Sequence, residues 1–186
     1  MLEVTGYFMV TLFGLAALSL LYYQVRTGVP PMPATFRERK DASKFLGELP
    51  LPSAAVVFEL GCGWGSLLSH LSRRHPELLY VGFEISLIPF LCSKIRFWGK
   101  KNVEIKRADF LKSDFSEADV LICYLMRAPM KKLEHHIQSH CISIRKGRRL
   151  PLITLAFWLK NKKPLKTTSY EPGVAVYEFI PLELQI

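Results

Sequence analysis

The sequence predicts one α/β domain with a doubly wound, mostly parallel sheet and a C-terminal antiparallel hairpin, preceded by one N-terminal transmembrane helix. Three observations lead to this prediction. Between residues 54 and 160, short apolar runs rich in β-branched residues alternate with helical patterns, which indicates parallel strands covered on both faces. After residue 160, two short strand patterns flank a Glu-Pro-Gly turn, which indicates a hairpin. Before the domain, the chain has one long uncharged stretch.

The uncharged stretch Val4–Val25 is 22 residues long and predicts a membrane-spanning helix. As a helix it would measure about 33 Å at roughly 1.5 Å per residue, and a hydrocarbon core is about 30 Å thick. Glu3 precedes it instead of a basic residue, and Leu21–Arg26 lacks a small-residue cleavage pattern. We therefore favour a retained anchor over a cleaved signal peptide. A buried helix of a soluble protein is the third alternative.

Basic residues follow this stretch, and no Lys or Arg precedes it. The positive-inside rule therefore predicts a single-pass membrane protein whose remaining chain faces the cytoplasm or an equivalent interior compartment. The basic residues concerned are Arg26, Arg37, Arg39 and Lys40.

We divide the chain into three segments. Residues 1–26 form the predicted transmembrane anchor. Residues 27–52 form a proline-rich linker followed by a short helix at Phe36–Leu49, because prolines interrupt both helix and strand between residues 27 and 35. Residues 53–186 form the predicted domain.

Charge and cysteine content narrow the class of partner. The formal net charge is +9, and basic residues concentrate after residue 144. Beside an anchor, such a surface is predicted to meet an anionic membrane surface, although a solvated basic face, a nucleic acid or an acidic protein partner gives the same composition. The four cysteines form no CxxC pair, so we expect neither a metal site nor disulfides, and we infer a reducing compartment.

The expected elements of the domain follow from apolar periodicity and capping residues. Helices are expected to begin at the N-caps Ser66 and Ser86 and in the segment Met130–Ser139. In the second of these helices, apolar residues recur at helical spacing: Leu87, Phe90, Leu91, Ile95 and Trp98. The expected strands are Val56–Leu60, Leu78–Glu84, Val103–Arg107, Val120–Leu125 and Leu150–Leu159, with a hairpin formed by Pro164–Tyr170 and Val174–Ile180.

A glycine-rich turn directly after the first strand is the most informative motif. Glu59 is followed by Gly61, Gly63 and Gly65 at alternate positions. A dinucleotide-binding turn needs a further glycine where this chain has Ser66, so a nicotinamide enzyme lacks support. No G-x-x-x-x-G-K-[ST] run is present either, which argues against a nucleoside triphosphatase.

Two further acids lie at the carboxyl ends of predicted strands. Glu84 ends the second strand, and Asp109 follows the third. Because ligands bind at the carboxyl ends of parallel strands where the strand order reverses, we expect these acids and Glu59 to face one crevice.

The glycine turn and the two acids, in this order, resemble the S-adenosylmethionine-dependent methyltransferases with a Rossmann-like fold, over residues 54 to 160. The resemblance implies that Gly61, Gly63 and Gly65 approach the methionine part of this cofactor, and that Glu59 orders the turn and contacts the ammonium group through water. It also implies two acceptors for the rest of the cofactor: Glu84 for both ribose hydroxyls and Asp109 for the adenine amine. The ordinary alternatives are a capping carboxylate for Glu84 and a solvated loop acid for Asp109.

The segment after the fourth strand bears on the methyl acceptor. Residues 119–129 depart from the Asn/Asp-Pro-Pro-Tyr motif of many amino-group methyltransferases, so methylation of DNA adenine or of glutamine loses support. With the anchor, the proline-rich Gly28–Pro33 and Tyr124-Leu125 followed by Pro129, the chain resembles membrane-anchored lysine methyltransferases. That family includes the mitochondrial enzymes for the ATP synthase c-subunit and the adenine nucleotide translocase, together with prokaryotic relatives.

This second resemblance implies a lysine of a membrane protein as the acceptor. Tyr124 is our candidate catalytic residue, placed to orient the amine, and a packing aromatic is the alternative. His135 and His136 are expected on the surface, away from the strand ends. Other functions stay open: methylation of a lipid-phase quinone or prenyl compound, a non-catalytic scaffold, or methylation of RNA, for which the chain lacks interleaved aromatic and basic residues.

Overall fold

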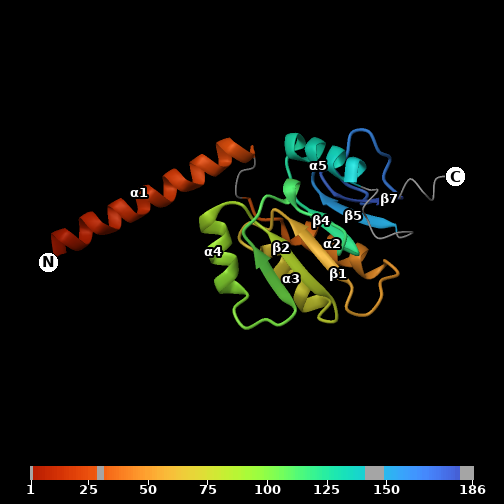
Figure 1. Cartoon of the computed structure of the whole chain (residues 1–186), viewed down its shortest axis with the longest axis horizontal. Coiled ribbons are helices and arrows are strands. Elements are labelled where there is room, and N and C mark those ends of the chain that lie inside the picture. Colours follow the sequence, from red (N-terminus) through yellow and green to blue (C-terminus); the bar gives the residue numbers. More distant parts are fainter. Residues whose placement is uncertain (1, 29–31, 141–148, 181–186) are drawn as a thin grey trace.

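The computed structural model describes residues 2–28, 32–140 and 149–180. A mixed sheet with helices on both faces forms the domain, and the long helix α1 extends away from it (Figure 1). The helices are α1 Leu2–Thr27, α2 Phe36–Gly47, α3 Ser66–Arg74, α4 Leu87–Arg96, the short 3₁₀ helix η1 Phe110–Lys112 and α5 Arg127–His140. The strands are β1 Val56–Leu60, β2 Leu79–Phe83, β3 Val103–Lys106, β4 Val120–Cys123, β5 Leu150–Leu155, β6 Lys166–Thr167 and β7 Val174–Phe179.

The seven strands lie in the order β3-β2-β1-β4-β5-β7-β6. The five strands from β3 to β5 run parallel, and β7 pairs antiparallel with both β5 and β6. The predicted doubly wound, mostly parallel sheet with a C-terminal antiparallel hairpin is therefore confirmed. Because the chain moves outward from β1 in both directions, the strand order reverses between β1 and β4, which places a crevice at their carboxyl ends.

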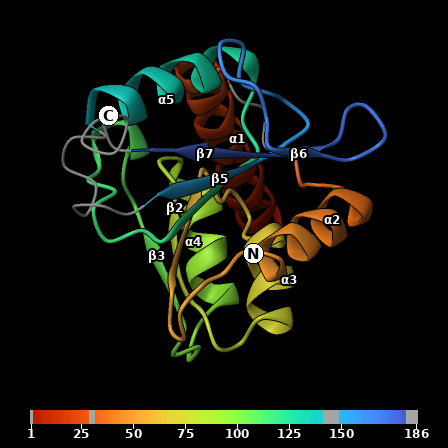
Figure 2. The same cartoon turned by 90° about the vertical axis from the view of Figure 1, so that its right-hand side faces the viewer.

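Helices cover both faces of the sheet (Figure 2), and a layer of buried apolar side chains lies on each face. On one face, α2 and α3 pack through Leu46 and Leu68, which are fully buried with Val57 of β1. On the other face, α5 packs through Leu133 and Ile137 against β4, β5 and β7. Side chains alternate between these layers along each strand, and both faces of a parallel sheet must be covered because neither is polar.

Several element ends differ from the expectations. Ser66 is the first residue of α3 and not its cap: Gly65 occupies the N-cap with a φ of 73°, a left-handed conformation that glycine adopts without strain. The strand expected over Val120–Leu125 ends at Cys123, and the one expected over Leu150–Leu159 ends at Leu155, where Ala156 has a φ of 62°. Ser86 is the N-cap of α4, as predicted.

The N-terminal helix α1 is exposed along most of its length. In the described part of the chain, Thr5–Thr27 is the one helix long and apolar enough to cross a membrane, and none of its most apolar window is buried. Its exposed side chains include Phe8, Phe13 and Leu18. In water such a surface would be unfavourable, since burying one Leu or Phe side chain contributes about 1.5–3 kcal/mol.

Candidate active site

The glycine turn after β1 folds back on β2 through its own backbone. The amides of Gly61 and Cys62 both donate to the carbonyl oxygen of Phe83, each at 2.9 Å. Gly61, Gly63 and Gly65 have φ values of 78°, 54° and 73°, which side-chain-bearing residues rarely adopt. The turn therefore requires glycine at all three positions.

The glycines at the two ends of this turn differ in their surroundings. A Cβ atom on Gly65 would lie 2.7 Å from a ring carbon of Phe97. The turn therefore packs so closely against the end of α4 that a side chain at this position would not fit. A Cβ atom on Gly63 would meet nothing within 4 Å. Gly63 lines a cavity at the carboxyl ends of β1, β2 and β4, whereas Gly65 does not line this cavity.

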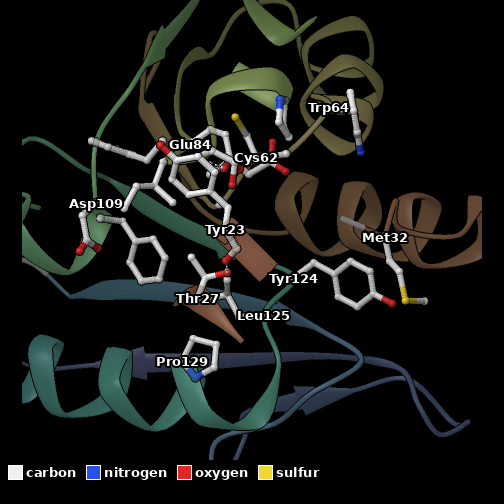
Figure 3. A pocket seen from close by; sticks show the side chains of 18 of the residues that line it. Tyr23, Thr27, Met32, Cys62, Trp64, Glu84, Asp109, Tyr124, Leu125 and Pro129 are labelled. Carbon is white, nitrogen blue, oxygen red and sulfur yellow. Dashed lines mark hydrogen bonds between the residues drawn. The ribbon is translucent and has the colours of Figure 1, made fainter. Parts of the chain in front are cut away.

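Most of the predicted site residues meet in this cavity, which we call the cofactor cavity. It is lined by Glu59, Gly61, Gly63, Glu84, Asp109 and Tyr124, and Figure 3 shows the side chains of several of its residues. The strand order explains the convergence, because the ends of β1, β2 and β4 are neighbours in space although they lie far apart in the sequence. Of the predicted site residues, Gly65 alone is not part of the wall.

Glu59 is a buried acid with an unsatisfied oxygen. It is 3% exposed, and its Oε2 has no hydrogen-bond partner among the residues described. Burial first, and the negative charge of Glu84 second, raise the pKa of Glu59 well above its usual range, while the Leu68 amide acts in the opposite direction. A cationic group in the cavity would compensate both effects.

Glu84 joins the glycine turn to α4. Its Oε2 accepts from the Gly63 amide at 2.8 Å, and its Oε1 accepts from the Ser86 amide at 2.7 Å. The capping role, which was the alternative to ribose binding, is thus present in the structure. It leaves room for the other role, because each carboxylate oxygen has a second lone pair that accepts a hydroxyl.

Asp109 and Tyr124 line other parts of the cavity. Asp109 Oδ1 accepts from the Leu111 amide at 3.1 Å and so caps η1. Tyr124 is half-buried, and burial first, then the charge of Glu38, raises the pKa of its hydroxyl. In Figure 3 the Tyr124 ring points away from Glu84 and Asp109, on the side where Met32 lies.

A second cavity adjoins the first, and we call it the acceptor-side cavity. Met32, Tyr124 and Leu125 line both. The rest of the second cavity comes from the start of α5, the segment after β5 and the turn before β7. Glu134 of α5 lines it: this side chain is 2% exposed, its Oε2 lies 3.4 Å from Asn161 Nδ2, and its Oε1 has no partner in the described part of the chain.

One wall of the cofactor cavity comes from α1 and was not predicted from the sequence. Tyr23, Gln24 and Thr27, in the last turns of this helix, line it. The Tyr23 hydroxyl accepts from Arg107 Nη2 at 3.1 Å, which ties the helix to the end of β3. The sequence gives little indication of this wall. Only the shortness of the linker to residue 35 indicates that the end of the helix lies close to the domain.

His135 and His136 of α5 line neither of the two cavities. His135 is exposed, as predicted, whereas His136 is half-buried, stacks edge-on against Phe115 and shares a hydrogen bond with the Ser113 carbonyl oxygen at 3.2 Å. Across the ranges that the structure describes, no group of three or more His, Cys, Asp or Glu side chains is placed to hold a metal ion. Cys141 lies outside the described residues.

The residues of the cofactor cavity fit S-adenosylmethionine. Glu59 offers an unpartnered buried oxygen to an ammonium group, Gly63 leaves open space against the backbone, and Glu84 is a two-oxygen acceptor suited to a ribose diol.

The fold and this site define a class I S-adenosylmethionine-dependent methyltransferase. Residues 59–166 match the family described as the ANTKMT methyltransferase domain, and the chain belongs to this family. Both the predicted resemblance and the predicted cofactor are confirmed.

Other similar proteins share the fold or part of the sequence. An RNA methyltransferase from Salinibacter ruber in complex with S-adenosyl-L-homocysteine superposes with a TM-score of 0.66 at 20% identity, covering 81% of this chain and 94% of that one. A tRNA (guanine-N(7)-)-methyltransferase from Thermotoga maritima is 41% identical over 58 residues, which are 30% of this chain and 18% of the relative. A ribosomal RNA small subunit methyltransferase A from Mycoplasma mobile is 33% identical over 88 residues, 46% of this chain and 33% of the relative. The chain thus spans less than half the length of these curated relatives.

Proposed function

We propose that this protein is a single-pass membrane methyltransferase that methylates a lysine side chain of a membrane protein, with its domain facing the cytoplasm or an equivalent interior compartment. The observation that carries the proposal is the wall that α1 contributes to the cofactor cavity through Tyr23 and Thr27. A helix suited to a bilayer ends at the site of the chemistry, so an acceptor would be methylated next to the membrane surface. The name of the family supports a protein acceptor.

Each predicted cofactor residue would bind a different part of S-adenosylmethionine. Gly61 and Gly63 bring backbone against the methionine part, Glu59 and Glu84 accept from its ammonium group and the ribose, and Asp109 accepts from the adenine amine. When bound, S-adenosylmethionine supplies an electrophilic methyl group on a positively charged sulfur. Glu59 and Glu84 are both buried, and a cation in this cavity would stabilise their charged forms.

The acceptor-side cavity is suited to an amine. A lysine ammonium would bind Glu134, whose Oε1 lacks a partner in the ranges described. The amine must lose a proton before it reacts, and with an ordinary pKa near 10.4 this costs about 4.6 kcal/mol at pH 7. The proton leaves through the open side of the cavity to water. Tyr124, shared by the two cavities, would orient the amine toward the methyl group that S-adenosylmethionine supplies when it is bound.

The test uses the full chain in membranes and S-adenosylmethionine with a labelled methyl group. We expect label on a protein of the membrane fraction, located on lysine by mass spectrometry and lost with the Glu84→Ala variant. Label on a protein residue other than lysine, or in soluble protein only, would refute the lysine or the membrane part of the proposal.

RNA is the second candidate acceptor, because curated relatives and the solved neighbour are named as RNA methyltransferases and the chain carries a net charge of +9. A lipid-phase quinone or prenyl compound is the third, since the α1 wall brings the cavity close to the proposed bilayer. Nuclease-sensitive label would establish the RNA alternative, and solvent-extractable label the lipid alternative.

A further inference from the structure

Helix α4 carries an apolar stripe that faces away from the domain. Leu87, Leu91, Ile95 and Trp98 are 37%, 48%, 71% and 86% exposed. Leu87, Leu91 and Ile95, spaced by four residues, lie on one side of α4, and Trp98 lies in the turn that follows the last helical residue, Arg96. An apolar stripe at this spacing ordinarily marks the buried side of a surface helix, and a contiguous exposed one marks a contact with another apolar surface.

The opposite side of α4 explains this orientation. Pro89 and Ser93 are the buried residues of this helix, and its C-cap Phe97 is buried as well. The Ser93 hydroxyl donates to the Gly63 carbonyl oxygen at 2.6 Å, and the Phe97 ring lies against Gly65. Contact with the glycine turn therefore fixes which side of the helix faces inward, and the larger aliphatic residues remain outside.

Basic residues surround the exposed stripe. Lys94 and Arg96 are exposed in the last turn of α4, and Lys100 and Lys101 are exposed after the turn that follows it. A helix with an apolar side and basic flanks is the pattern of an interfacial helix on anionic lipid. Trp98, near the end of the stripe, is of a residue type that is enriched at headgroup depth.

Helix α4 also lies next to α1. The two helices are in contact, and Leu20 of α1 and Pro89 of α4 line the same cavity. In Figure 1, α4 is on the side of the domain from which α1 extends. A bilayer that contains α1 would thus be adjacent to the exposed side of α4.

The geometry points to α4 as an interfacial membrane helix, whose apolar stripe lies in the headgroup region of the same anionic bilayer that α1 crosses. This inference rests on the part of the proposed function that embeds α1, and it is independent of the methyl acceptor. It has a structural consequence. Because Ser93 and Phe97 on the inner side contact the glycine turn, one helix connects the membrane surface with the cofactor cavity.

The experiment measures the environment of Trp98 in the full chain, reconstituted as single copies in nanodiscs of phosphatidylcholine and phosphatidylglycerol. The difference between the fluorescence of the wild type and of Trp98→Phe isolates the emission of this residue. We expect lipids brominated near the headgroup to quench it, and aqueous iodide to lose its effect. The double variant Leu91→Glu/Ile95→Glu should restore quenching by iodide.

A matched control places a tryptophan on the other edge of the sheet, in the variant Trp98→Phe/Leu165→Trp. Leu165 is 64% exposed beside β6, so this residue should be quenched by iodide and not by the lipid. Trp98 emission that iodide quenches as strongly as the control would overturn the inference. Protection that appears only with two copies per disc would also overturn it, in favour of a contact between copies. Extraction of the chain by alkaline carbonate would refute the α1 anchor itself, which keeps the two failures distinct.

Discussion

The cofactor cavity and the acceptor-side cavity share Met32, Tyr124 and Leu125, yet they are built in different ways. The first is formed largely by the ends of adjacent parallel strands and one glycine turn, so its residues follow strands at fixed offsets in the sequence. The second is formed by one side of α5 and by segments after β5 and before β7. The first can be read from a motif, whereas the second depends on how distant segments pack. Variants in each cavity should therefore affect one ligand and leave the other unchanged.

The largest expected effect is that of Glu84→Ala on the cofactor cavity. The variant loses the hydrogen bonds to the Gly63 and Ser86 amides together with the proposed ribose contact. We expect the dissociation constant of S-adenosylmethionine to rise at least about 100-fold, because a hydrogen bond to a charged group contributes about 1.5–3 kcal/mol and about 1.4 kcal/mol corresponds to tenfold. Isothermal titration calorimetry of the full chain in detergent measures this. Glu117→Ala, at an exposed acid outside both cavities, is the control and should bind as the wild type does.

Glu134→Gln should have the next largest effect, on the acceptor side. The variant keeps the shape of the side chain and removes the charge that would bind an ammonium group. We expect the acceptor concentration for half-maximal methyl transfer to rise about 10- to 100-fold, which corresponds to about 1.5–3 kcal/mol. The dissociation constant of S-adenosylmethionine should stay unchanged. If the variant weakens the cofactor and not the acceptor, the division between the two cavities is wrong.

Glu59→Gln should change ligand binding and stability in opposite directions. Because burial and the charge of Glu84 raise the pKa of Glu59, the folded protein binds this proton more tightly than the unfolded chain. The stability of the ligand-free wild type should therefore fall as the pH rises from the ordinary range of Glu toward the raised pKa. The variant should lack this contribution, unfold at higher temperature at neutral pH, and bind S-adenosylmethionine about tenfold more weakly, since about 1.4 kcal/mol corresponds to tenfold. Thermal unfolding against pH measures the first effect, and parallel curves for both proteins would contradict it.

The different construction of the two cavities explains why the sequence predicts residues of the first cavity and not those of the second. The strand Val56–Leu60 and the glycines after it were located residue by residue, because left-handed backbone and close approach to α4 leave few alternatives to glycine. Glu84 and Asp109 were predicted to face one crevice because the carboxyl ends of parallel strands converge, and both line the cofactor cavity. Glu134 was not found. A single acid on one side of a helix resembles a solvated residue until the contact between α5 and the segment after β5 is known.

Helices α3 and α4 show a second limit of sequence patterns. Both have apolar residues at helical spacing, and α3 buries Leu67, Leu68 and Leu71 in the core as such a pattern predicts. In α4 the contact of Ser93 with the glycine turn decides the orientation, and the apolar side remains exposed. A periodic pattern identifies the helix, but it does not reveal whether the apolar side meets a protein core or a membrane.

The smallest expected effect is that of Tyr124→Phe, at a residue shared by the two cavities. Burial and the charge of Glu38 raise the pKa of the Tyr124 hydroxyl, which therefore stays protonated at neutral pH and is able to donate or accept. Loss of one such hydrogen bond contributes about 0.5–1.5 kcal/mol, so we expect kcat to fall about 2- to 10-fold with little change in cofactor binding. Tyr124→Leu, which also loses the ring, separates the two roles of this residue. If the Phe variant keeps full activity and the Leu variant does not, Tyr124 acts by packing alone, and orientation of the amine must come from another group in the acceptor-side cavity.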